Sequence, residues 1–359
     1  MKRIVGISSG LSGWFAERLP VERFTAYLRK KEVPRHRYWI WYLFGGLTLF
    51  FLITQIVTGI LLSLNYTADP EHAHESVRRI VNELPHGWLI RSIHSWSANL
   101  LIACALVHMF SVFFMKSYRK PRELMWVSGL VLMFLLLGFG FTGYLLPWDT
   151  TAYFATLIGT EVPGTVPIIG DWGLRVLKGA SDIGRETLAR MYTIHTIVLP
   201  LTALFFVGLH LVLGHLLGAS VPIGVAEKYP RMKFFPNFLY RDLVAWLLGL
   251  ALLVTLSTIL PRGLEEKANP FASAPAGIRP EWYFLPLFQS LRMVPASVLS
   301  VSGDFIVNLG VLLGSAFWFL VPFIDRKAMR EQKGRMFTAI GVLVLAYYIG
   351  TIAIAYVTT

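Results

Sequence analysis

Three observations predict that the chain is an all-α polytopic membrane protein. Of its 359 residues, 55% are hydrophobic and only 15% are charged, whereas a soluble domain carries about 25% charged residues. Seven apolar runs are long enough to cross about 30 Å of hydrocarbon as helices. Lys and Arg gather at alternate ends of these runs, as they do in membrane proteins. We therefore expect seven transmembrane helices.

The seven runs lie at residues 38–64, 90–114, 124–147, 191–217, 243–260, 304–324 and 336–357. The composition changes at 218–240, between the fourth run and the fifth. Residues 14–31 alternate apolar and basic positions at helical spacing, which favours a helix on the inner membrane surface, although a soluble N-terminal turn is the alternative. We expect an inner-surface amphipathic segment, a four-helix bundle, an inner linker and a three-helix C-terminal module, at residues 1–37, 38–217, 218–240 and 241–359.

The distribution of basic residues predicts the orientation in the membrane. Of the 33 Lys and Arg residues, 22 lie before the first run or in the connections after the second, fourth and sixth runs. This pattern places the N-terminus in the cytoplasm, and we expect an integral protein of a bacterial inner membrane. The net charge of +12 follows the same pattern, so nucleic acid binding is not expected. Cys104 is the only cysteine, which excludes an internal disulfide.

Histidines recur inside the apolar runs. His94 and His108 lie in the second run, and His195 and His210 lie in the fourth. Ionisable groups at membrane depth are costly and mark functional sites, although a single histidine more often makes an interhelical hydrogen bond. Spacings of fourteen and fifteen residues keep each pair on one helix face, about 21–23 Å apart along the axis. Both runs cross in the same direction, so we expect two sites of two imidazoles each.

Glycines repeat with the same period on the neighbouring runs. Gly45 and Gly59 in the first run are fourteen residues apart, as are Gly129 and Gly143 in the third. Because glycine weakens a helix by about 1 kcal/mol relative to alanine, matched pairs suggest close approach of a flat, bulky group. Helix packing is the alternative explanation.

A flat group held between two imidazoles indicates haem, and two sites indicate two haem b groups. Ligation on both faces leaves no open iron position, which favours electron transfer. Arg91 at the outer level, and Arg122 with Lys120 at the inner level, are candidates to bind haem propionates. Their alternative role is to anchor the helices at the membrane surface.

Five segments resemble a known family. They read "WLIRSIHSWSANL", "KPRELMWVSG", "GYLLPWD", "ARMYTIHTIVLPL" and "RPEWYFLPLFQSLRMVP". They are similar to the cytochrome b/b6 family, the membrane core of Rieske-type quinol:cytochrome oxidoreductases. The resemblance implies a four-helix dihaem bundle. It also implies that His94 and His195 ligate an outer, low-potential haem, and that His108 and His210 ligate an inner, high-potential one.

The resemblance is to the plastid-type branch, with its four-helix and three-helix parts fused. The fifteen-residue step from His195 to His210 and the end after seven runs are both similar to that branch. That branch attaches a third haem through a cysteine near the start of the first run, where this chain reads "YWIWYLFGGL". A third haem near the inner site is therefore conceivable, but covalent attachment is not expected.

The resemblance also implies two quinone sites. At the outer one, Glu281 accepts a quinol proton and Tyr283 hydrogen-bonds the ring, within the element Pro280, Glu281, Trp282 and Tyr283. Burial in an apolar element would raise the pKa of such a carboxyl group; a loop carboxylate that caps a helix is the alternative. Residues 143–148 form the opposite wall. Inner-site candidates are His215, Arg241 and Asp242, of which the last two are equally suited to an interfacial anchor.

The implied activity is quinol oxidation with electron bifurcation and proton translocation, the Q cycle. The implied partners are a Rieske iron–sulfur protein, a c-type cytochrome, quinol and quinone, lipid and a second copy of the chain. A dihaem membrane anchor of a dehydrogenase explains the histidines but not residues 280–283. An ion transporter with histidine relays predicts no haem. A copper–haem oxidase is disfavoured because the sequence has no adjacent His-His pair.

Overall fold

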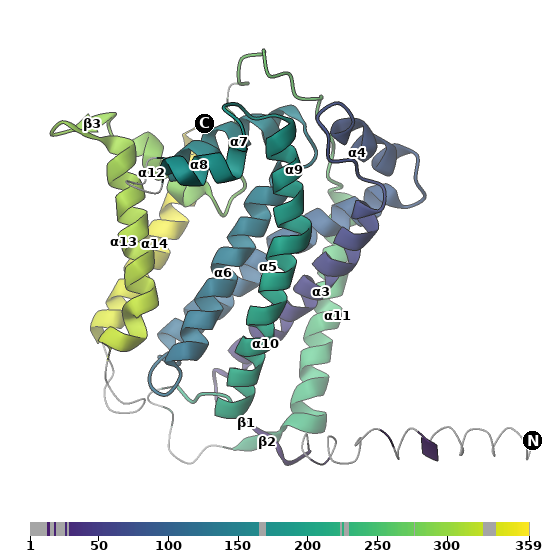
Figure 1. Ribbon diagram of the computed structural model, residues 1–359. Helices are drawn as coiled ribbons and strands as arrows, with labels where there is room; N and C mark the ends of the chain where they lie inside the picture. The colour runs from purple at the N-terminus through teal and green to yellow at the C-terminus, as the bar shows by residue number, and fades with distance from the viewer. Residues whose placement is uncertain are drawn as a thin grey trace, which may run out of the picture.

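The protein is an elongated group of long helices that run side by side (Figure 1). The structure is a computed structural model. It describes residues 29–164, 170–222, 230–275, 277–325 and 335–358, with isolated positions 13, 14, 18, 26 and 225. Most of the expected amphipathic segment before residue 29 lies outside the described residues.

Seven candidate membrane spans confirm the expected number of transmembrane helices within the described part of the chain. The first is the short 3-10 turn η1 (Trp39–Tyr42) with α3 (Leu43–Ser63). The second and third are α5 (Gly87–Phe114) and α6 (Glu123–Tyr144). The fourth combines α9 (Arg185–Thr193), the π-helical turn η2 (Ile194–Val198) and α10 (Leu199–Leu217). The last three are α11 (Leu239–Ile259, preceded by the turn η3, Phe234–Phe238), α13 (Gly303–Ile324) and α14 (Arg335–Val357).

The long connections are helical and gather at one end of the bundle, which we call the loop side (Figure 1). They contain α4 (Ala73–Asn82), α7 (Thr150–Gly164), α8 (Gly170–Lys178) and α12 (Leu285–Met293). Leu145, Leu188 and Met191 form a fully buried core beneath them. The same end carries a hairpin of β3 (Ser297–Val298) and β4 (Val301–Ser302).

The opposite end, the strand side, carries a two-stranded antiparallel sheet. In it β1 (Glu32–Pro34) pairs with β2 (Arg231–Lys233). The expected segments 1–37 and 218–240 thus meet in a short sheet, although residues 223, 224 and 226–229 lie outside the described part. The all-α prediction holds for the membrane-spanning part, because these strands are only two or three residues long.

The last three spans flank the four-helix bundle. Helix α11 packs against α3 and α5, whereas α13 packs against α6 and α14 packs against α5 and α12. Figure 1 shows α11 on the flank opposite α13 and α14. On the strand side a buried ion pair of 2.8 Å joins Arg119, after α5, to Asp325, after α13. The C-terminal spans are therefore fastened directly onto the bundle.

Candidate functional site

The four predicted histidines meet in two pairs inside the four-helix bundle. The ring centroids of His94 and His195 are 6.4 Å apart, and those of His108 and His210 are 6.5 Å apart. Metal–imidazole bonds are about 2 Å long. Two such bonds, together with the distance from each ligating nitrogen to the centre of its ring, account for the separation of the centroids. Each pair can therefore hold one metal ion between two imidazoles.

The π-helical turn η2 explains why a fifteen-residue step matches a fourteen-residue step. Within it the backbone N–H of Leu199 donates to the carbonyl of Ile194, five residues earlier. Such a turn inserts one extra residue into an α-helix and is frequent at functional sites. His195 lies in η2, so the helix from His195 to His210 advances almost as far as α5 does from His94 to His108. Both levels therefore reach the same ring separation.

Hydroxyl groups on α3 and α6 contact three of the four imidazoles. Thr58 Oγ1 lies 2.9 Å from Nδ1 of His94, Thr142 Oγ1 lies 3.0 Å from Nδ1 of His195, and Ser128 Oγ lies 3.0 Å from Nδ1 of His210. Each hydroxyl also donates its proton to a helix carbonyl, of Thr54, Gly138 and Met125 respectively. The hydroxyl oxygen must then accept from Nδ1–H, which leaves the Nε2 lone pair free. This is the tautomer that ligates metals through Nε2.

His108 differs from the other three. Its Nδ1 is buried and has no hydrogen-bond partner among the described residues. The equivalent position on α3 is Phe44, which carries no hydroxyl group.

The four predicted glycines each face one histidine. A Cβ atom on Gly45 would lie 3.3 Å from His108, on Gly59 3.3 Å from His94, on Gly129 3.1 Å from His210 and on Gly143 2.6 Å from His195. These separations are tighter than ordinary carbon contacts of about 3.5–4.0 Å. A side chain at these positions would displace the imidazole ring, so the glycines leave space for the four histidine side chains.

The two arginines predicted for propionates contact backbone carbonyls. Arg91 donates to the carbonyls of Arg262 and Gly263, at 2.6 and 3.0 Å. Arg122 donates to those of Gly218 and Leu217, at 2.7 and 2.8 Å, and thereby caps the end of α10. Burial lowers the pKa of Arg122. The propionate assignments stay predictions, with Lys120, the third residue assigned to them.

Within residues 280–283, the side chains of Trp282 and Tyr283 contact the helices of the bundle. Trp282 Nε1 donates to Asn99 Oδ1 on α5 at 2.7 Å. Tyr283 is buried against Gly140 on α6, where a Cβ atom would lie 2.8 Å from the phenol oxygen. Burial, and then the charge of Glu281, raise the pKa of Tyr283. The predicted opposite wall, residues 143–148, is joined to the loop that precedes residues 280–283, because Ala268 N–H donates to the carbonyl of Trp148.

Sequence reasoning did not identify the partner of Glu281. Arg262 lies 3.3 Å from Glu281 Oε1, with side-chain exposures of 37% and 19%. The Arg262 guanidinium also sits 5.3 Å from the centre of the Trp96 ring. No motif marks Arg262, because its position relative to Glu281 depends on the path of the eighteen residues between them. A half-buried carboxylate next to a cation and a buried phenol can carry a proton.

The predicted residues of the inner quinone site lie on two helices at the strand side: His215 on α10, and Arg241 and Asp242 on α11. His215 Nδ1 lies 3.0 Å from Nζ of Lys31, whose pKa is lowered by burial. Arg241 lies over the Trp39 ring at 5.6 Å. The carboxylate of Asp242 lies against Gly46 on α3. Oδ1 of Asp242 and Nε1 of Trp246 are both buried, and neither has a hydrogen-bond partner in the described part of the chain. Two unsatisfied polar atoms on α11 suit a polar ligand.

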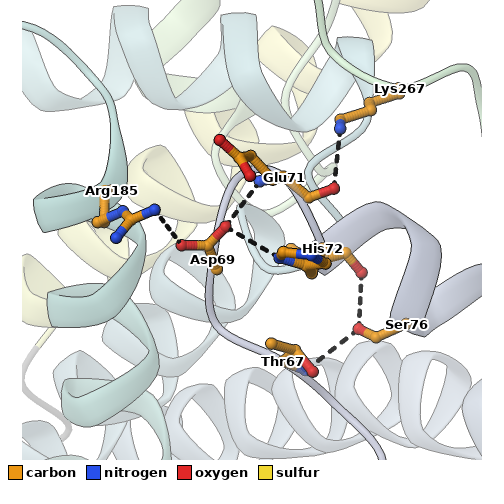
Figure 2. Close-up of polar contacts among 8 residues, drawn as sticks. Thr67, Asp69, Glu71, His72, Ser76, Arg185 and Lys267 are labelled. Carbon is orange, nitrogen blue, oxygen red and sulfur yellow. Dashed lines mark hydrogen bonds and ion pairs between the residues drawn. The ribbon is translucent and has the colours of Figure 1, made fainter.

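A carboxylate–histidine cluster on the loop side resembles a cation site by its residue types alone. Asp69, Glu71 and His72 bring ligand atoms within 4.8 Å of one another. Figure 2 shows that Asp69 already accepts from the backbone of Glu71, from His72 and from Arg185. Arg185 is the first residue of α9, so these contacts join the cluster to the start of the membrane span that contains His195.

Two family models match the chain. Residues 28–218 match the model described as cytochrome b/b6/petB, and residues 267–358 match the model described as cytochrome b(C-terminal)/b6/petD. The first covers the histidine pairs and the second covers residues 280–283. Two parts with separate models are thus fused in one polypeptide.

Relatives and a solved structure agree with these matches. The chain is 48% identical over 343 residues to the cytochrome bc complex cytochrome b subunit of Chlorobaculum thiosulfatiphilum, which covers 94% of this chain and 78% of the relative. It is 38% identical over 216 residues to cytochrome b6 of Prochlorococcus marinus, which covers 60% of this chain and 99% of the relative. A chain of a hyperthermophilic respiratory Complex III aligns with a TM-score of 0.84 and 28% identity, over 96% of this chain and 91% of that chain.

Proposed function

Because the chain belongs to the cytochrome b/b6 family, we propose that it oxidises quinol at the loop side and reduces quinone at the strand side, as the cytochrome b subunit of a bc-type quinol:cytochrome c oxidoreductase. The seven candidate spans make it an integral membrane protein. The observation that carries the proposal is the pair of facing imidazoles at each of two levels.

The residues fit two haem b groups. His94 with His195, and His108 with His210, would hold one iron each, since the ring separation accommodates a metal ion and three of the four histidines have Nε2 set as the ligating atom. Haem held by these two histidine pairs would supply one-electron transfer. The family resemblance assigns the lower potential to the loop-side site. A third, non-covalently bound haem on the strand side stays within the proposal.

Glu281 is proposed to accept a proton from quinol. The carboxylate lies 3.3 Å from the Arg262 guanidinium, and its side chain is 19% exposed. The Arg262 guanidinium pairs with this carboxylate and positions it. Release of the Glu281 side chain from Arg262 would then pass that proton outward. Tyr283, whose raised pKa keeps it protonated, would donate a hydrogen bond to the quinol ring.

The strand-side quinone site is proposed around Asp242, Arg241 and His215. The buried Oδ1 of Asp242 lacks a partner in the described residues, and the hydroxyl group of a quinol or a bridging water would satisfy it by donating a hydrogen bond. Lys31 beside His215 adds a proton donor close to the same face.

The proposed assembly follows from the family. It comprises a Rieske iron–sulfur protein, a c-type cytochrome and a second copy of this chain. The proposed setting is a bacterial inner membrane with the N-terminus in the cytoplasm, as the basic residues indicate.

Replacement of single ligands tests the haem assignment. In the purified complex, His210→Ala should lose the strand-side haem, while the loop-side haem stays reducible by quinol. His94→Ala should lose the loop-side haem, and quinol should then reduce neither haem. Pyridine haemochrome assays before and after acidic acetone extraction count the b haems and reveal any covalent haem. Two haems retained in His210→Ala would contradict the ligand assignment.

Glu281→Gln tests the proton acceptor separately. Loss of a general base typically costs 10²–10⁴-fold in rate, so quinol oxidation should fall by about that factor with haem content unchanged. Glu265→Gln, a neighbouring exposed carboxylate, is the control and should retain activity. Equal activity of Glu281→Gln and the parent would exclude the proposed role.

A further inference from the structure

A hydroxyl residue directly precedes three of the four glycines that face the histidines. The pairs are Thr58-Gly59, Ser128-Gly129 and Thr142-Gly143, and the fourth position reads Phe44-Gly45. In each of the three, the glycine leaves space for the ring and the hydroxyl contacts Nδ1 of the same ring. Helices α3 and α6 thus present a two-residue cradle to each imidazole, complete at three positions and incomplete at His108.

We propose that these hydroxyls are positioning residues that set the electron affinity of the two haem sites, and that Phe44 makes the strand-side site the stronger electron acceptor. This inference rests on the proposed haem ligation. The loop-side pair receives two hydroxyl contacts, from Thr58 and Thr142, whereas the strand-side pair receives one, from Ser128.

The direction of the effect follows from the hydrogen bonding. Each hydroxyl proton is directed to a helix carbonyl, at 2.7 Å for Thr58, 2.8 Å for Thr142 and 3.0 Å for Ser128. The oxygen therefore accepts from Nδ1–H. An acceptor on Nδ1–H makes the imidazole a stronger electron donor through Nε2, which stabilises the oxidised iron. More hydroxyl contacts thus lower the potential of the haem.

Phe44 cannot replace the missing contact. Its ring stacks on Trp41 with centroids 5.6 Å apart and an interplanar angle of 24°. Nδ1 of His108 is buried and finds no acceptor in the part of the chain that the structure describes. The His108 imidazole is therefore the weakest donor of the four. An electron shared between the two sites is drawn from the loop side toward the strand side, which is the direction that the proposed quinone site requires.

Removal of single hydroxyl groups tests the proposed effect on the loop-side haem. Thr58→Val and Thr142→Val keep the side-chain shape. Each should raise the equilibrium constant for reduction of the loop-side haem on the order of tenfold, the lower end of the effects of hydrogen-bond partners of metal ligands. For one electron this corresponds to a potential about 59 mV higher. The measurement is an optical redox titration of the whole complex. Thr54→Val is the matched control, because the Thr54 hydroxyl donates to the carbonyl of Phe50 on the same helix and has no hydrogen bond to a histidine among the described residues. Thr58→Ser should restore the parent potential.

Addition of a hydroxyl group tests the proposed effect on the strand-side haem. Residue 44 precedes Gly45 in the same way that Thr58 precedes Gly59. Phe44→Thr should therefore place a hydroxyl acceptor next to Nδ1 of His108. The strand-side haem should then become harder to reduce by a similar factor, while the loop-side potential stays constant. This variant adds an interaction, so it remains informative even if a Thr→Val variant fails to retain haem.

The outcomes separate this inference from the proposed function. Unchanged potentials in Thr58→Val and Phe44→Thr, with two haems bound, would overturn the hydroxyl inference and leave the ligation intact. A parent complex without b haem would overturn the proposed function, and this inference with it.

Discussion

Two helices carry the histidine pairs, and they reach the same geometry by different means. Helix α5 is regular from Gly87 to Phe114 and places its histidines fourteen residues apart. The α9–η2–α10 helix places its histidines fifteen residues apart and absorbs the extra residue in the π-helical turn. Ring separations of 6.4 and 6.5 Å at the two levels show how closely the two solutions agree. The histidine sites therefore depend on the rise and rotation of a helix, and the residue count alone does not describe them.

The helices also differ in how their ends are held. The chain after α5 is tied down by Arg119 and Asp325, with exposures of 0% and 2%. The start of α9 is held by Arg185 and Asp69, with exposures of 67% and 20%. The regular helix ends in a buried contact, and the helix with the irregular turn begins in an exposed one. Single changes in the two helices should therefore have unequal effects.

Single-residue deletions should give the largest difference between the helices. Deletion of Ala103 from α5 rotates His108 by about 100° relative to His94 and should lose one b haem per chain. Deletion of the exposed Ile197 from η2 should convert the turn to regular α-helix and leave two haems. Haem content per chain measures both. Equal haem loss in the two variants would show that η2 does not absorb the extra residue.

Asp325→Ala should strongly destabilise the strand side. Removal of one partner from a buried ion pair costs about 3–5 kcal/mol, and Tyr118 would also lose its hydrogen bond of 2.8 Å to Asp325. The free energy of unfolding should fall by that amount in thermal or denaturant unfolding of the purified complex. Asp304→Ala replaces an exposed aspartate in the first turn of α13 and is the control. A stable Asp325→Ala variant would mean that the ion pair is dispensable.

Lys116, just after α5, should give a smaller and pH-dependent effect. Burial, and then the charge of Arg119, lower its pKa from 10.5 to about 8. Between pH 8 and 10.5 the unfolded chain holds this proton and the folded chain does not, so stability rises with pH across that window. Lys116→Met should remove this slope and stabilise the protein at pH 7 on the order of 1 kcal/mol, after allowance for solvent screening.

The measurement for Lys116 is the unfolding temperature of parent and variant between pH 7 and 10. The difference between them should shrink as the pH rises above 8. A constant difference would show that Lys116 does not titrate in this range.

Asp69→Asn should have the smallest effect. Exposed ion pairs contribute little to stability, although the backbone N–H of Glu71 and then His72 and Arg185 hold the pKa of Asp69 low. We expect an unchanged unfolding temperature and unchanged haem content. A loss of the loop-side haem would instead mean that the contact shown in Figure 2 positions α9 and His195.

Hydropathy and charge determined much of the fold because a span in hydrocarbon must satisfy its backbone hydrogen bonds internally and so becomes a helix. The number of spans and the family could be predicted from the runs and the segments around the histidines and residues 280–283. The helices α7 and α8 within the long loop were not predicted, because their packing on the loop-side core provides the stability that their sequences lack.

The sequence by itself determined which residues form the site: four histidines and four glycines at matching intervals, since a helix repeats its faces with a fixed period. The tertiary structure alone decided how they meet. The extra residue between His195 and His210 is compatible with either a rotated ring or a π-helical turn, and only packing against α6 selects the turn. The Arg262–Glu281 pair and the hydroxyl contacts on Nδ1 likewise join residues of distant segments. Periodicity acts along one helix, whereas these contacts depend on distances between helices.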